Sequence, residues 1–141
     1  MDERERTVFL TAYRMALADG ELSANEALLL NLFAKGLGIT TEELFSLKKE
    51  AARVDLESLP EKFPDRGEQL ALVETIYLVA MIDGRDAPEE QQLVARLTEL
   101  FALTQSESGK CLRAARTRMR KLGQQHDLLT EVLANTEKED A

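Results

Sequence analysis

The sequence predicts an all-α protein: a single compact domain of about seven helices, built from two tandem helical repeats that share one core. Three observations lead to this prediction. Apolar residues recur at the spacing i, i+3, i+4 and i+7, which places them on one face of a helix. No segment shows the alternation of apolar and polar residues between hairpin turns that is typical of strands. The chain also matches itself without a gap when it is shifted by 64 positions, the separation of Asp19 and Asp83.

The composition favours a soluble protein of one domain. The chain has 141 residues, of which 44% are hydrophobic and 31% charged, and this length suits a core of ordinary size. No apolar run approaches the roughly 18 residues of a membrane span, and no secretory signal follows the charged N-terminus. The single cysteine fits a reducing compartment, and a net charge of −8 disfavours nucleic acid as a partner. We therefore expect a cytoplasmic protein without membrane insertion.

The repeats are expected over about residues 4–57 and 65–122, with a connector at 58–67. Because one repeat alone is too small to bury its apolar stripes, both are expected to contribute to the same core. Identical residues that coincide under the shift include Thr11 and Thr75, Tyr13 and Tyr77, Ala16 and Ala80, Gly20 and Gly84, Leu29 and Leu93, Thr40 and Thr104, and Glu43 and Glu107.

The first repeat is expected to hold helices near 4–18, 24–36 and 41–54. The first of these carries an apolar stripe made of Phe9, Ala12, Tyr13 and Ala16. The second begins with the capping pattern Ser-x-x-Glu at Ser23, and the third with Thr-x-x-Glu at Thr40. In such patterns the hydroxyl and the returning carboxylate satisfy free backbone amides at the helix start.

After a short helical turn at 56–63, the second repeat is expected to hold helices near 65–82, 88–101 and 105–121. Asp65, Pro88 and Thr104 mark their starts, because proline suits the first helical position and the other two are capping residues. A last amphipathic helix is expected over about 125–134, followed by a frayed acidic tail. Its apolar side is made of Leu128, Leu129, Val132 and Leu133.

Each repeat has an acidic turn between its first two helices, DGELSANE in the first copy and DGRDAPEE in the second. The turn is similar to the second half of an EF-hand loop. The first two ligand positions would be Met15 and Leu17, however, and these side chains do not coordinate calcium, so an EF-hand is excluded. Glu26 and Glu90 fall at the third position of the following helix, where a carboxylate caps the helix and interacts favourably with its dipole.

Asp19 and Asp83 are expected to close a helix, where a negative charge is disfavoured by about 0.3–1 kcal/mol. Two interpretations of this repeated cost are open. Each aspartate accepts hydrogen bonds from free amides of the next helix, or it holds a divalent cation together with the glutamate of its turn. Carboxylate oxygens suit calcium, magnesium or manganese rather than zinc. The candidate metal ligands are Asp19, Glu26, Asp83 and Glu90.

The doubled pattern of Ala-Asp-Gly or Ile-Asp-Gly, followed by Leu-Gly-Ile-Thr or Ala-Leu-Thr, resembles the TerB-like family. That family includes tellurite-resistance protein B and a related domain of some membrane-anchored J-domain co-chaperones. The resemblance extends from about Arg4 to Lys121. It implies an all-helical, two-repeat bacterial domain, a link to tellurite and other stress responses, and binding of a divalent metal or a partner through acidic residues. Asp86 and Ala87 depart from the pattern, since the family usually has an apolar residue and a capping hydroxyl there.

A basic segment, KCLRAARTRMRKL, forms most of the last helix of the second repeat. Two interpretations are again open. The cations form a solvated face that also suits the end of a helix, or they dock an acidic protein partner, a second copy of this chain included. The candidate partner-binding residues are Arg113, Arg116 and Arg120.

The residue pattern gives no sign of an enzyme. His126 is the only histidine, Cys111 aligns with the apolar Leu47 and is expected to be buried, and no nucleophile or phosphate-loop motif occurs. The first hypothesis is therefore a TerB-like stress-response domain that acts as a non-enzymatic sensor or scaffold and binds a divalent cation. The alternative is a protein-interaction module whose acidic turns are only helix caps and whose basic helix docks an acidic partner.

Overall fold

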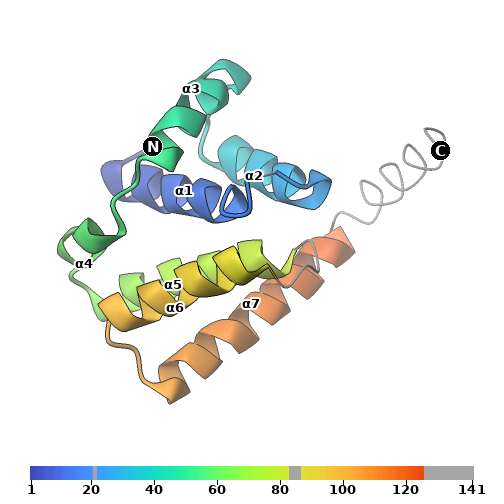
Figure 1. The fold of residues 1–141 in the computed structure, drawn as a ribbon. Coiled ribbons are helices and arrows are strands. Elements are labelled where there is room, and N and C mark those ends of the chain that lie inside the picture. The colour runs from blue at the N-terminus through green and yellow to red at the C-terminus, as the bar shows by residue number, and fades with distance from the viewer. Residues whose placement is uncertain (21, 83–86, 126–141) are drawn as a thin grey trace.

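A computed structural model describes residues 1–20, 22–82 and 87–125 of the chain (Figure 1). In these ranges every regular element is a helix and no strand occurs, which confirms the predicted all-α fold class. The elements are α1 (Glu3–Ala16), α2 (Ala24–Gly36), α3 (Thr41–Ala52), the 3-10 turn η1 (Leu56–Ser58), α4 (Leu59–Lys62), α5 (Arg66–Met81), α6 (Pro88–Leu100) and α7 (Gln105–Gln125).

The helices form two layers (Figure 1). Helices α1, α2 and α3 lie in one layer and α5, α6 and α7 in the other, and the short α4 lies at the edge where the chain passes between them. Helix α5 packs against α7, α1 and α6, and α1 packs against α2 and α3. Because α1 and α5 contact each other, the buried apolar side chains form one cluster that draws on both layers.

The two predicted apolar stripes are buried to different extents. The whole stripe of α1, from Phe9 to Ala16, is buried. In α5 the corresponding Val73 and Ile76 are buried, but Tyr77 and Ala80 are only half-buried. Part of the stripe on α5 is therefore exposed to solvent, whereas the equivalent part of the stripe on α1 is buried.

Side-chain caps fix the starts of the helices, as the sequence predicts. At α2, the Ser23 hydroxyl accepts from the Glu26 amide at 3.1 Å, and the Glu26 carboxylate accepts from the Ser23 amide at 3.0 Å. Thr104 and Glu107 make the same pair of bonds at α7. At α6, Pro88 occupies the first turn and Ala87 offers no side-chain bond. The capping interpretation of Glu26 is thus confirmed.

The bounds of the helices agree with the 64-residue shift. Helices α2 and α6 start and end 64 positions apart, and so do the starts of α3 and α7. The ends of α2 and α6 also match, because Gly38 has φ +75° and Ala102 has φ +50°. The amide that follows each of them donates back into its helix at 2.9 Å. The repeat itself stays a prediction that these equal bounds support.

The structure corrects three predicted boundaries. The first helix ends at Ala16 rather than at 18, so Asp19 lies in the turn beyond the helix and does not close it. The third helix ends at Ala52 rather than at 54, whereas the short helical turn predicted at 56–63 is present as η1 and α4. The basic helix continues to Gln125, whereas the amphipathic helix at 125–134 and the frayed tail fall almost wholly outside the described residues. No helix in the described ranges combines the length and apolarity needed to cross a bilayer.

Candidate functional site

The start of α2 contacts the end of α5. The Asn25 side chain, in the first turn of α2, donates to the Ile82 carbonyl at the end of α5 at 3.2 Å. This contact joins the turn that holds Asp19 to the residue that directly precedes Asp83. Asp83 itself lies outside the described residues, so the full set of four predicted metal ligands is not placed.

Both predicted glutamates are buried. Glu26 is 0% exposed and Glu90 is 2% exposed, and each is the third residue of its helix, α2 and α6 respectively. A capping glutamate at the surface would be hydrated, whereas a buried carboxylate is costly unless polar groups or cations surround it. Within the described ranges, no three histidine, cysteine, aspartate or glutamate residues gather closely enough to hold a metal ion.

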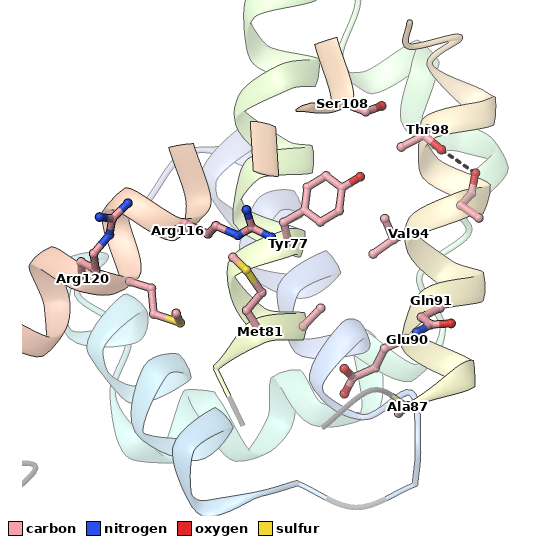
Figure 2. A pocket seen from close by; sticks show the side chains of 13 residues that line it. Tyr77, Met81, Ala87, Glu90, Gln91, Val94, Thr98, Ser108, Arg116 and Arg120 are labelled. Atoms are coloured by element: carbon pink, nitrogen blue, oxygen red, sulfur yellow. Dashed lines mark hydrogen bonds between the residues drawn. The ribbon is translucent and has the colours of Figure 1, made fainter. Parts of the chain in front are cut away.

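A groove of about 860 Å³ opens between α6 and α7, with α5 as its floor (Figure 2). Tyr77 and Met81 of α5 lie in the centre of the view, and Val94 and Thr98 line the α6 wall. The half-buried Tyr77 and Ala80 noted above are thus exposed to this groove. Its surface is mainly apolar, which makes it a candidate for binding another apolar surface.

Charged residues lie at the border of this groove. Arg116 and Arg120 line it from α7, and Glu90 lies at the end where α6 begins (Figure 2). Arg113 belongs to the same helix but does not line the groove. Of the three predicted partner-binding arginines, the structure therefore brings two to one site and leaves the third outside it.

Within the part of the chain that the structure describes, Arg116 and Arg120 have no partner, whereas most of the other arginines do. Both are exposed, and among the described residues neither forms an ion pair or a side-chain hydrogen bond. Other arginines bind a carboxylate: Arg4 with Glu68, Arg6 with Glu50, Arg66 with Glu107, Arg96 with Glu57, and Arg118 with Glu74. In a chain of net charge −8, two free guanidinium groups beside an apolar groove favour a ligand that brings its own negative charge.

The Tyr77 phenol stays neutral in the groove. Burial raises its pKa, the nearby Cys111 raises it further, and the Ser108 side chain acts in the opposite direction. The neutral hydroxyl is both a donor and an acceptor. Tyr77 therefore adds a polar group to an otherwise apolar floor.

A second hollow, of about 540 Å³, lies between the two layers and is lined by Phe9, Phe33 and Phe63, among others. Both arginines that line it, Arg4 and Arg118, have carboxylate partners within the molecule. Arg118 lies 6.0 Å from the centre of the Phe33 ring, donates to the Thr75 hydroxyl at 3.2 Å and is 3.7 Å from Glu74. This hollow thus lacks the free cations that distinguish the groove between α6 and α7.

The groove is the part of the site that the sequence does not predict. The sequence pattern predicts Tyr77, Met81 and Met119 as core residues of amphipathic helices. A core position and a groove position differ only in how far the side chain is buried, which the sequence pattern does not give. The basic segment was the one available signal, since it places cations on the helix that forms one wall. No family model, no curated protein and no solved structure matches this chain.

Proposed function

We propose that the chain is a TerB-like domain of the stress-response, tellurite-resistance type that acts as a non-enzymatic scaffold, and that the groove between α6 and α7 binds a protein partner. The partner chemistry that fits is an acidic amphipathic helix. One observation carries the proposal: Arg116 and Arg120, which have no partner among the described residues, border an apolar groove in an acidic protein.

The apolar surface of the groove and its two arginines contribute differently to recognition. Apolar side chains of the ligand would cover Tyr77, Met81 and Val94, and removal of this surface from water stabilises the complex. Acidic side chains on the flank of the same helix would pair with Arg116 and Arg120, which selects acidic over basic partners. The resemblance to the TerB-like family supports a role in a stress response, and the groove supports partner binding as the way in which the domain acts.

The methionines allow a direct test of binding. The chain has four, of which Met81 and Met119 line the groove and Met15 lies in the core with 0% exposure. The full chain, labelled with ¹³C at the methionine methyl groups, is titrated with a short synthetic peptide that has leucines on one helical face and glutamates on the other. We expect the Met81 and Met119 signals to shift and the Met15 signal to stay.

Two controls test the role of the arginines. The variant Arg116→Glu/Arg120→Glu should lose binding, whereas Arg113→Glu, which changes the charge on the same helix outside the groove, should keep most of it. Added salt should weaken binding, because charges at an exposed border are screened. A peptide with lysine in place of glutamate that binds equally well would refute the proposed selectivity.

A second candidate function is divalent-cation sensing at the paired acidic turns. The observation that favours it is the bond from Asn25, which adjoins the buried Glu26, to the carbonyl of Ile82, the residue before Asp83. Two buried carboxylates at one end of the molecule form a setting in which a hard cation would reduce the cost of burial. The ion in question is calcium, magnesium or manganese.

A thermal melt of the metal-stripped protein tests this second function. With about 1 mM cation and a dissociation constant near 10 μM, binding adds about 2.7 kcal/mol of stability, which corresponds to a rise in melting temperature of about 5–10 °C. The rise should vanish in the variant Asp19→Asn/Asp83→Asn. If that variant instead loses stability equally with and without cation, the aspartates are structural.

A further inference from the structure

The chain carries a ligand of the proposed chemistry in its own sequence. Residues 126–141 contain five acidic residues and one lysine, and the apolar residues Leu128, Leu129, Val132 and Leu133 have helical spacing. We propose that residues 127–134, called the tail segment below, occupy the groove between α6 and α7 of the same chain. This inference rests on the proposed function, because it names an occupant for the groove described there.

Charge complementarity is the first argument. The tail segment contains Asp127 and Glu131 and no basic residue. The groove offers Arg116 and Arg120, which have no partner among the described residues. Opposite charges of this kind orient a helix in a groove and fix its register.

Reach is the second argument. Helix α7 ends at Gln125, five residues after Arg120 and nine after Arg116, distances of about 8 and 14 Å along a helix. Eight residues of tail segment span about 12 Å as a helix, and a reversal between antiparallel helices takes as few as about two residues. With His126 and Asp127 as the reversal, the seven remaining residues span about 11 Å. They pass the level of Arg120 and end about 3 Å short of the level of Arg116, within reach of its long side chain.

The apolar surface is the third argument. A helix of eight residues is not stable alone in water and needs a surface to pack on. The leucines of the tail segment find such a surface in Met81, Met119 and Tyr77, which line the groove. The tail segment then competes for the groove with any external helix of the same chemistry.

The methionine signals of the full chain test this occupancy. In the variant Leu129→Asp/Leu133→Asp, called the tail variant, the Met81 and Met119 signals should move relative to wild type, while that of Met15 stays in place. The movement should be the same at high and low protein concentration, because the contact lies within one chain. Identical spectra of wild type and tail variant would overturn the inference, and a difference that disappears on dilution would assign the groove to a second copy.

An exchange of charges between the groove and the tail segment tests whether their side chains pair, and the Met15 signal reports separately on folding. The variant Arg116→Glu/Arg120→Glu should give groove signals close to those of the tail variant. Addition of Glu131→Arg and Asp127→Arg to this background should restore the wild-type positions, because the charges attract again. Failure of the exchange to restore them, with Met15 unchanged, would contradict the proposed pairing.

Peptide binding separates this inference from the proposed function. If the tail segment itself binds the groove with a Kd of about 0.1 mM and its tether gives an effective concentration of about 1 mM, the synthetic acidic peptide should bind the tail variant roughly tenfold more tightly than wild type. A peptide of residues 126–141 should also bind the tail variant. If the synthetic peptide binds and the 126–141 peptide does not, the tail inference fails and the function stands; if neither binds, both fail.

Discussion

At the scale of single residues, the Glu107 carboxylate is held by hydrogen bonds from two other residues. The Arg66 guanidinium donates two hydrogen bonds of 2.8 Å to it from α5, and the Thr104 amide donates a third. These donors, Arg66 first, lower the pKa of Glu107 to about 2. Because the charged form is favoured in the folded state, Glu107 stabilises the fold fully above its ordinary pKa and loses this contribution as the pH falls toward 2.

We predict that the stability difference between wild type and Glu107→Gln is largest near neutral pH and narrows between pH values of about 5 and 2. Urea unfolding at several pH values measures the difference, and an NMR titration of the Glu107 carboxyl gives its midpoint directly. Arg66→Met is the matched variant, since it removes the donors and should return the pKa of Glu107 toward its ordinary value. A midpoint near 4 in the wild type would contradict the prediction.

Two residues at equivalent helix ends give a second prediction. Gly38 and Ala102 both follow the last turn of a helix with positive φ, at +75° and +50°. An L-residue in this conformation is strained by about 1–2 kcal/mol, and glycine loses about 0.4–1 kcal/mol more backbone entropy on folding than alanine. We therefore expect Ala102→Gly to stabilise the protein by about 0.5–1 kcal/mol and Gly38→Ala to destabilise it by a similar amount, as measured by denaturant unfolding.

At the scale of helices, the caps of α2 and α6 form a natural pair. Ser23 and Ala87 hold the same position with extended backbones, at φ −71° and −72°, but only Ser23 has a hydroxyl to cap its helix. Ser23→Ala should cost about 1 kcal/mol and Ala87→Ser should gain about 0.5–1 kcal/mol. Thermal unfolding measures both. Changes of the same sign would show that the two helix starts are not equivalent.

The helix starts are also the part of the fold that the sequence predicts best. For the six helices expected before residue 122, each start lies within one residue of the observed one, because caps such as Ser23, Thr40 and Pro88 act on their own helix and need no tertiary contact. The ends are less accurate. Helices α1 and α3 both stop two residues early. The glycine with positive φ after α1, Gly20, lies four residues past the end of the helix, whereas Gly38 lies two residues past the end of α2 and marks that end more closely.

The groove could not be predicted in the same way. Tyr13 and Tyr77 hold equivalent positions in the sequence, yet Tyr13 is buried and Tyr77 lines the groove. The difference depends on how α6 and α7 pack beside α5, and helical periodicity carries no information about that. The burial of Glu26 and Glu90 was missed for the same reason, because a capping glutamate is expected at the surface unless another layer covers it.

At the scale of the whole molecule, the two layers should unfold together. Ile76 lies on α5, is 1% exposed and belongs to the cluster of apolar side chains that spans both layers. Ile76→Ala should cost about 2–5 kcal/mol, since it removes buried methyl groups and leaves a cavity. Hydrogen exchange should then show an equal loss of protection in α2 and in α6, although Ile76 belongs to neither helix.

The comparison of these two helices decides whether the molecule has one core. Contacts between α1 and α5 connect the layers. If the layers share a single core, a loss of stability at α5 lowers the free energy of unfolding for the helices of both layers. Ala34 on α2 is the matched site in the other layer, because it is 3% exposed and Ala34→Gly should lower protection in α6 as well as in α2. If each substitution affects only its own layer, the chain consists of two units that fold separately, and the groove between α6 and α7 then belongs to the second unit alone.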